Sequence, residues 1–351
     1  MRNSLRSIPF MMILTSMETS IDNYNLDTRH VARAVLITGG AGYIGSHTCK
    51  MLRKNGFVPI VLDRNMKNKL QTSDPSFDVD IPTNIQAVDE IVKRYQIKSC
   101  IHLAGTSNSR DATKNPAVFY KNNFIGTMSL LDKLLECGVE NFVFSSTASV
   151  YGNSDLISIP ETALVDPLNA YASSKLATEK MIEDYTKAYG LKSVVLRYFN
   201  VAGHDNDDDL NECTARENQL VQILINCARQ GKNFDLYGDG SAVRDYVHVT
   251  DVAEANIRAL VHCINGCKFT TLNIGSGIGT TNKAVIDAVE RYVGKIYTTT
   301  KPKNQSEINS SVADITKAKE ILDWEPTQSS IDNVVATAVK WYNKTHKKEI
   351  Q

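Results

Sequence analysis

"VLITGGAGYIGSH" (residues 35–47) presents Gly39, Gly42 and Gly45 in the spacing GxxGxxG, directly after a short apolar run. The apolar spacing of the residues that follow predicts that a helix opens here. Glycines between a strand and a helix permit a tight turn and a close approach of the backbone, and the free N–H groups of the first helical turn attract a pyrophosphate. The stretch therefore predicts a strand, a turn and a helix that together bind a dinucleotide.

An acidic residue, Asp63, ends the next apolar run, "PIVLD" (residues 59–63). A carboxylate in this position accepts hydrogen bonds from the adenosine ribose and repels a 2′-phosphate, which favours NAD over NADP. Arg64 follows it directly and weakens that repulsion. The alternative is that Asp63 only caps a turn. We predict that Asp63 binds NAD.

Short runs rich in Val and Ile alternate with helical patterns through the first 200 residues. The runs span residues 34–38, 59–63, 99–105, 141–146 and 193–200. Two helical stripes lie between them, one of Val88, Ile91, Val92 and Tyr95 and one of Ile125, Met128, Leu131 and Leu135. This alternation indicates βαβ units with right-handed crossovers, and so predicts a doubly wound parallel sheet of the Rossmann α/β class.

We expect the chain to divide into three parts. Residues 1–32 are predicted to be a disordered extension, because the basic start and the run "IPFMMIL" lack the longer apolar core and the cleavage site of a secretory signal. Residues 33–197 form the NAD-binding domain, and about 245–266 return to it. Residues 198–351 form a smaller substrate lobe. No run approaches the ~20 apolar residues of a membrane span.

The composition excludes some classes of binding partner. Lys and Arg total 39 and Asp and Glu total 39, so no overall charge favours nucleic acid or an anionic membrane. The seven cysteines form no CxxC pair and are scattered, which favours reduced thiols in a cytoplasmic protein. Only Cys263 and Cys267 are close, and without a second cluster of ligands we predict no metal site.

The segment "NAYASSKLATEK" (residues 169–180) has Tyr171 and Lys175 four residues apart. At helical spacing both side chains point the same way, and a nearby ammonium stabilises a phenolate, so that a tyrosine can act as an acid and base. Two alternatives are open: the residues belong to a face that packs on the core, or Lys175 pairs with Glu179 on the surface.

A third candidate, Thr147, lies at the strand end "FSSTASVYG" (residues 144–152). Its hydroxyl could bond the reacting oxygen of a substrate, although hydroxyl residues at strand ends are also ordinary turn formers.

These motifs together resemble the extended short-chain dehydrogenase/reductase superfamily. Within it, the chain is similar to the UDP-glucose (UDP-galactose) 4-epimerases from about residue 33 to the C-terminus. The segments that carry this resemblance are "TGGAGYIGSH", "HLAG", "YKNNFIGT", "FSSTASVYG", "YASSK", "LRYFNVAG" and "RDYVHVTDVA". The resemblance implies a cytoplasmic homodimer that contacts its partner through two helices of the first domain, at residues 124–138 and 171–190.

The resemblance also implies a reaction. In that family a tightly held NAD takes a hydride from C4 of the sugar while the tyrosine takes the hydroxyl proton, and the 4-keto sugar turns over before the hydride returns to its other face. Tyr171 would be the base, Lys175 its electrostatic partner and Thr147 the bonding hydroxyl. The substrates would be UDP-glucose and UDP-galactose, with UDP-N-acetylhexosamines as further candidates.

Further residues follow from the same resemblance. The cofactor would contact Gly39, Gly42, Tyr43, Ile44, Gly45, Asp63, Asp80, Ile81, Leu103, Ala104, Gly105, Asn122, Ser145, Tyr171, Lys175 and Phe199. The nucleotide sugar would contact Thr147, Asn200, Gln219, Tyr237, Arg244 and Ser311. Arg244 would hold the diphosphate, for which a guanidinium fork is suited, although it could instead pair with Asp245 or Asp251 on the surface.

The chain departs from the family at several positions. Asn304 and Glu307 stand where the family carries a second diphosphate-binding Arg and a ribose-binding Asp, and Gln219 replaces an Asn. Ser311 is small where bulk decides whether an N-acetyl group fits, so we expect N-acetylhexosamines to be admitted.

Two other classes of function are considered: a reductase or dehydrogenase on the same fold, and a non-catalytic NAD-binding regulator. The intact Thr147, Tyr171 and Lys175 count against the regulator. Ala148 and Ser149 stand where dehydratases and decarboxylases of this branch carry an acidic residue, which disfavours those reactions.

Overall fold

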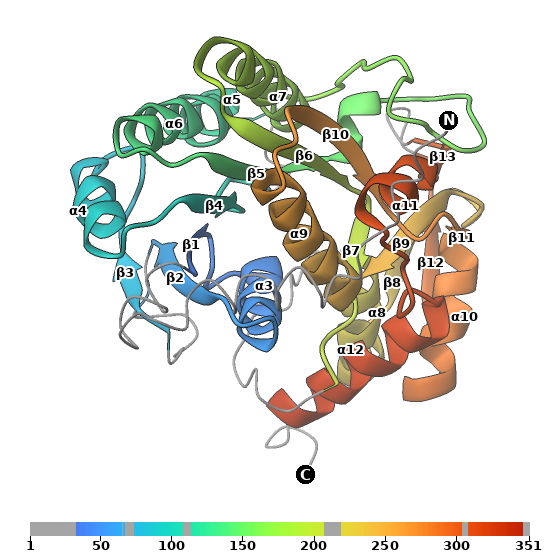
Figure 1. Ribbon diagram of the computed structural model, residues 1–351. Coiled ribbons are helices and arrows are strands. Elements are labelled where there is room, and N and C mark those ends of the chain that lie inside the picture. The colour runs from blue at the N-terminus through green and yellow to red at the C-terminus, as the bar shows by residue number, and fades with distance from the viewer. Residues whose placement is uncertain are drawn as a thin grey trace, which may run out of the picture.

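A seven-stranded parallel sheet forms the centre of the molecule (Figure 1). The computed structural model describes residues 33–64, 66, 74–107, 114–206, 219–303 and 308–346. The strands of the sheet, in spatial order, are β10 (Phe269–Ile274), β6 (Lys192–Tyr198), β5 (Asn141–Thr147), β4 (Ser99–His102), β1 (Ala34–Thr38), β2 (Val58–Asp63) and β3 (Ser76–Asp78). The order reverses direction at β1, so the predicted doubly wound α/β fold is confirmed.

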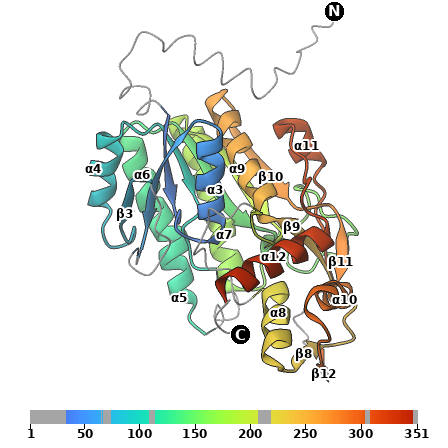
Figure 2. The same cartoon turned by 90° about the horizontal axis from the view of Figure 1, so that it is seen from below.

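Helices cover both faces of this sheet (Figures 1 and 2). One face carries α3 (Tyr43–Lys54), α9 (Val249–Ile264) and α11 (Thr316–Leu322), and the other carries α4 (Gln86–Arg94), α5 (Pro116–Phe119), α6 (Gly126–Glu136) and α7 (Ala170–Tyr189). Successive strand residues point to opposite faces. Val35 and Ile37 of β1 therefore belong to the α3 and α9 core, whereas Leu36 between them belongs to the other core. Burial on both faces explains the continuous apolar runs in the sequence.

The prediction of a buried face was confirmed for one of the two helical stripes and was partly wrong for the other. Val88, Ile91 and Val92 are buried in α4, as predicted. The second stripe was wrong in part, because Ile125 and Met128 are 48% and 36% exposed. The buried side chains of α6 are Thr127, Leu130, Leu131 and Leu134. Residues Tyr120–Ile125 form a π-helical turn before α6, and its wider turn shifts the face that later residues present.

In its described residues the second lobe contains two small sheets and a cluster of helices, set beside the main sheet in Figure 2. In one sheet β9 (Val243–His248) pairs with β7 (Asn200–Ala202), β11 (Gly279–Thr281) and β13 (Ser310–Ser311), and the other joins β8 (Phe234–Tyr237) to β12 (Thr298–Lys301). A shared core joins α8 (Leu220–Gln230), α10 (Asn282–Val293) and α12 (Ile331–Thr345).

The chain crosses between the lobes more than once. Helix α9 packs against α3, within the span expected to return to the first domain. Strand β10 also joins the main sheet, by pairing with β6, although the sequence assigned it to the second lobe. The proposed extension at 1–32 and the positions Asn304 and Glu307 lie outside the described residues. None of the described helices combines the length and the hydrophobicity that a bilayer span requires.

Candidate active site

The glycine turn between β1 and α3 is built for close backbone contact. Gly39 has a φ of +71°, and a Cβ there would lie 2.7 Å from the backbone nitrogen of Ala104. A Cβ on Gly45 would lie 2.1 Å from the carbonyl oxygen of Gly39. Gly42 precedes the first residue of α3, and no side chain caps that helix. The first residues of α3 line the larger of two cavities, so the positive end of the helix dipole lies at the cavity wall.

Asp63 supports this turn from the end of β2. Its Oδ2 accepts a hydrogen bond from the amide of Ala41 at 3.1 Å, and its Oδ1 accepts one from the amide of Arg64 at 2.8 Å. Asp63 also lines a cavity of about 310 Å³. The turn-capping role considered for Asp63 is thus present together with a position on the cavity wall.

Tyr171 and Lys175 are held in the first turns of α7. The Asn169 side chain caps this helix by accepting a hydrogen bond from the amide of Ala172 at 3.0 Å. Lys175 is buried, and its Nζ donates to the carbonyl oxygen of Ser145 at 2.7 Å. Glu179 is also buried and bonds to Arg197, which argues against the surface pair of Lys175 and Glu179. The ammonium is therefore fixed against the end of β5.

Thr147 has the turn-forming role considered for it and also lies on a cavity wall. Its Oγ1 accepts a hydrogen bond from the amide of Ser149 and donates one to the Ser149 hydroxyl, both at 3.2 Å. These bonds cap a short 3₁₀ helix, Ala148–Tyr151. Thr147 nevertheless lines the same cavity as Tyr171 and Lys175. The last residue of β5 therefore both starts a turn and meets the two residues of α7.

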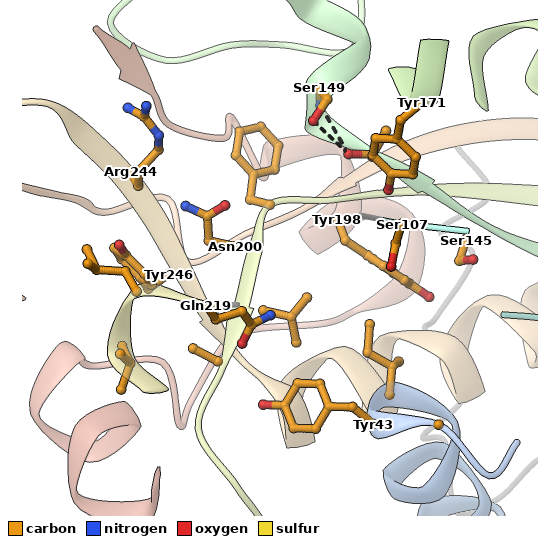
Figure 3. A pocket seen from close by; sticks show the side chains of 18 of the residues that line it. Tyr43, Ser107, Ser145, Ser149, Tyr171, Tyr198, Asn200, Gln219, Arg244 and Tyr246 are labelled. Atoms are coloured by element: carbon orange, nitrogen blue, oxygen red, sulfur yellow. Dashed lines mark hydrogen bonds between the residues drawn. The ribbon is translucent and has the colours of Figure 1, made fainter. Parts of the chain in front are cut away.

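This larger cavity measures about 610 Å³ and lies between the two lobes. Figure 3 shows Tyr171 and Ser149 on one side of it, Arg244 and Tyr246 on the other, and Asn200 between them. The predicted residues that line it are Gly39, Gly42, Tyr43, Ile44, Gly45, Leu103, Gly105, Ser145, Thr147, Tyr171, Lys175, Phe199, Asn200, Gln219, Tyr237 and Arg244. The predicted residues that line the smaller cavity without lining this one are Asp63, Asp80, Ile81, Ala104 and Asn122. The two cavities share wall residues at the glycine turn, an arrangement that suits an elongated dinucleotide.

Comparison with known proteins agrees with this geometry. The model of the NAD dependent epimerase/dehydratase family matches residues 35–275. The chain belongs to this family. It is 35% identical over 323 residues to the UDP-glucose 4-epimerase of Rhizobium meliloti, covering 88% of this chain and 97% of the relative. For the UDP-glucose 4-epimerase of Halalkalibacterium halodurans the identity is 38% over 320 residues, and the coverage is 89% and 96%.

Solved structures of the epimerase family share the fold. The UDP-glucose 4-epimerase of Brucella ovis in complex with NAD superimposes with a TM-score of 0.83 at 32% identity, over 88% of this chain and 98% of that one. The resemblance predicted from the sequence motifs to UDP-glucose 4-epimerases is therefore confirmed.

Ser311 differs from the other predicted site residues, because it is not among the residues that line either cavity. It lies on β13, in register with Arg244 on the neighbouring strand β9. Arg244 itself lines the larger cavity, and its Nη1 donates to the carbonyl oxygen of Val243 at 2.8 Å. Ser311 is thus one strand away from a wall residue.

Sequence reasoning missed Asn123, which organises the wall opposite α3. Its Oδ1 accepts from the amide of Thr106 at 2.8 Å, and its Nδ2 donates to the Ser174 hydroxyl at 3.0 Å. The bonds tie the π-helical turn to α7 and to the loop after β4. The motif "YKNNFIGT" drew attention to Asn122 next to it, but the π-helical turn, from which both amides bond to Thr106, was not predicted.

We predict that Asp63→Ala weakens NAD binding by at least about tenfold, because it removes a charged acceptor from both the turn and the cavity wall. The measurement is the NAD content of the purified protein after denaturation. Asp63→Asn is the matched control, since it keeps an oxygen for the Ala41 amide and loses only the charge. Unchanged cofactor content in Asp63→Ala would remove Asp63 from the cofactor site.

Proposed function

We propose that this protein interconverts UDP-glucose and UDP-galactose by NAD-dependent epimerisation at C4. The observation that carries the proposal is that Thr147, Tyr171 and Lys175 meet on the wall of one cavity, which extends from the glycine turn to Arg244. The relatives that support it are named UDP-glucose 4-epimerases, and the chain spans nearly their full length.

The residues around the glycine turn fit a dinucleotide. The tight approach at Gly39 and Gly45, the N-terminus of α3 and the carboxylate of Asp63 would hold its pyrophosphate and adenosine ribose. Lys175 would contact the ribose at the nicotinamide end. When bound, NAD supplies the acceptor and the donor of the hydride at C4.

The chain's own residues handle the proton and the oxygen. The Tyr171 phenolate removes the proton from the C4 hydroxyl and later returns it, as a general base and acid. The buried Lys175 ammonium is held by the Ser145 carbonyl on the wall of the same cavity as Tyr171. The Thr147 hydroxyl bonds the C4 oxygen and so orients it toward Tyr171.

The opposite side of the cavity suits a nucleoside diphosphate. Arg244 lies across the cavity from Tyr171, so a diphosphate between them would gain charge-assisted bonds. Tyr237 lines the rim and is 52% exposed, which leaves its ring free to stack on a uracil. Asn200 lies between these groups, within reach of the sugar phosphate.

The deciding experiment is proton NMR of the purified protein with UDP-galactose and without added NAD. The appearance of the anomeric signal of UDP-glucose supports epimerisation with retained cofactor. If a parallel sample with added NAD instead accumulates an oxidised sugar with a matching rise in NADH absorbance, the protein is a dehydrogenase. If a folded, NAD-containing protein leaves UDP-galactose unchanged, the proposed substrate is wrong.

We also predict that UDP-N-acetylgalactosamine is a substrate, because Ser311 places little bulk beside Arg244. Ser311→Tyr should lower kcat/KM for the N-acetylated sugar by at least about tenfold and leave that for UDP-galactose nearly unchanged. Ser310→Tyr, one residue earlier on the same strand, is the control. An inert UDP-N-acetylgalactosamine beside an active UDP-galactose would contradict the prediction.

We further propose that the protein is a cytoplasmic homodimer that associates through the first domain. Val118, Tyr120, Ile125 and Met128 are each more than a third exposed and follow one another from α5 into α6, as in many dimer interfaces. Sedimentation equilibrium should give a mass of two chains. Ile125→Glu should lower it to that of one chain, whereas a dimer unchanged in mass would assign the contact to another surface.

A further inference from the structure

A buried ion pair lies directly behind the three proposed catalytic side chains. Glu179 of α7 and Arg197 of β6 are 3% and 7% exposed. Arg197 Nη2 approaches Glu179 Oε2 to 2.6 Å, and its Nε lies 3.1 Å and 3.2 Å from the two carboxylate oxygens. Three contacts fix the two planar groups against each other, so the pair has one geometry.

The two members of this pair bond to opposite ends of the segment Ser146–Tyr151. The Ser146 hydroxyl donates to Glu179 Oε1. At the other end of the segment, Tyr151 OH accepts from Arg197 Nη1 at 2.9 Å, and the Arg197 guanidinium carbon lies 4.9 Å from the Tyr151 ring centroid. Thr147 lies between these two anchors. The segment that contains Thr147 is therefore bonded to the pair on both sides of Thr147.

The same pair sets the register between β5 and α7. Glu179 follows Lys175 by one helical turn, and the two side chains bond to consecutive residues of β5: Lys175 Nζ to the Ser145 carbonyl and Glu179 to the Ser146 hydroxyl. Two neighbouring hydrogen bonds therefore join the helix that carries Tyr171 to the strand that ends in Thr147.

Further bonds complete the network on its far side. Tyr151 OH donates to the side-chain oxygen Oδ1 of Asn273 at 2.7 Å. The backbone N–H of Asn273 donates to Glu161 Oε1 at 2.7 Å. Asn273 lies on β10, so the network reaches from α7 across β6 to the edge of the sheet. A buried polar network in which the members are bonded in this way specifies one arrangement of the elements it joins.

Stability alone is a weak reason for such a pair. The cost of removing two charges from water often cancels their attraction, and well-packed apolar residues of similar volume can replace a buried ion pair without loss of stability. What an apolar pair cannot supply is the directional contact to Ser146 and Tyr151.

We propose that Glu179 and Arg197 are positioning residues, which hold the segment Ser146–Tyr151 so that the Thr147 hydroxyl meets Tyr171 and the substrate oxygen. The inference rests on the proposed function, because it concerns the geometry of that reaction. Misplacement of a catalytic group by about 1 Å can cost about 100-fold in rate, so a relaxed segment would act on kcat.

The first test is the double variant Glu179→Met/Arg197→Met, which avoids leaving one charge buried alone. We expect it to fold and to keep its NAD, and we expect kcat with UDP-galactose to fall about 30-fold while KM changes less than about threefold. Glu183→Gln is the matched control: it breaks an exposed ion pair with Lys187 on the same helix and should leave kcat unchanged.

The second test repeats the exchange in a Thr147→Val background. If the pair acts through Thr147, the further loss of kcat there is less than about threefold, because the group it positions is already gone. A full 30-fold loss in that background would overturn the proposal. If wild-type protein epimerises UDP-galactose and the folded double variant matches it, the inference fails and the proposed function stands. If wild-type protein itself is inactive on UDP-galactose, the proposed function has failed instead.

Discussion

Tyr171→Phe is expected to lower kcat for UDP-galactose by at least about 100-fold, the usual scale for a general base, and to retain NAD. The substitution removes only the phenol oxygen. The ring keeps its edge-to-face contact with Phe119, whose ring centroid lies 6.3 Å away, so the start of α7 should not move. Lys175 keeps its bond to the Ser145 carbonyl, and the glycine turn is not touched.

The measurement is the initial rate of UDP-glucose formation, with the NAD content of each sample determined in parallel. Tyr189→Phe is the matched control, because it removes a hydroxyl from the last residue of the same helix, where the side chain is 65% exposed. We expect that control to be fully active. A Tyr171→Phe protein with near wild-type kcat would assign the proton transfer to another residue.

The parts of the site that sequence predicted are those whose signal is local. Gly39 and Gly42 precede α3 and Gly45 lies in its first turn, because a strand, a turn and a helix follow one another directly in the sequence, and the conformation of Gly39 serves that turn. Tyr171 and Lys175 are one helical turn apart in any α-helix, so their common direction needed no tertiary information. The parallel direction of the strands likewise follows from strands that alternate with helices.

What sequence missed depends on contacts between distant segments. The π-helical turn before α6 has no strong sequence pattern, and Ile125 lies in that turn and is 48% exposed. The pairing of β10 with β6 joins residues about 75 positions apart, beyond the reach of periodicity. Ser311 was placed by motif alignment alone, and its distance from the cavity wall depends on how β13 pairs with β9.

The polar network behind Thr147 was missed for the same reason. Arg197 lies inside the apolar run 193–200, and period alone indicates only a buried strand there. Its partner Glu179 was considered as a surface partner of Lys175. Only the packing of α7 on β6 brings the two charges together and shields them from water. A charged residue in the middle of a buried strand is thus the one sequence signal that could have indicated the pair.

Four buried histidines lead to the second large prediction, a loss of stability in mild acid. Burial lowers the pKa of His47 and of His102 to about 3, and that of His204 and of His248 to about 4. Both ring nitrogens of His102 have a hydrogen-bond partner: Nδ1 lies 2.6 Å from Thr38 Oγ1, and Nε2 lies 2.8 Å from Thr127 Oγ1. The folded protein therefore keeps these rings neutral where the unfolded chain protonates them.

The sign follows from proton binding. Below pH 6.5 the unfolded chain binds protons that the folded protein refuses until about pH 4, so the free energy of unfolding falls as the pH falls through that window. Each histidine contributes a loss of about 2 kcal/mol between pH 7 and pH 5, or up to about 8 kcal/mol for the four. Burial raises the pKa of Asp251 to about 6, which works in the opposite direction and offsets about 1 kcal/mol.

We therefore expect the free energy of unfolding of the NAD-saturated protein to fall steeply between pH 7 and pH 5, and the urea midpoint to fall with it. The fall in free energy should be comparable to the whole stability of an ordinary domain. Urea titrations at half-unit steps of pH measure it. His102→Gln removes one titrating ring but keeps an amide that can bond to Thr38. For this variant the free energy of unfolding should change less steeply with pH, by about 1.4 kcal/mol per pH unit, which is the contribution of one bound proton. A midpoint that stays constant down to pH 5 would mean that water reaches these rings in the folded protein, because only a hydrated imidazole could take up its proton without unfolding the chain.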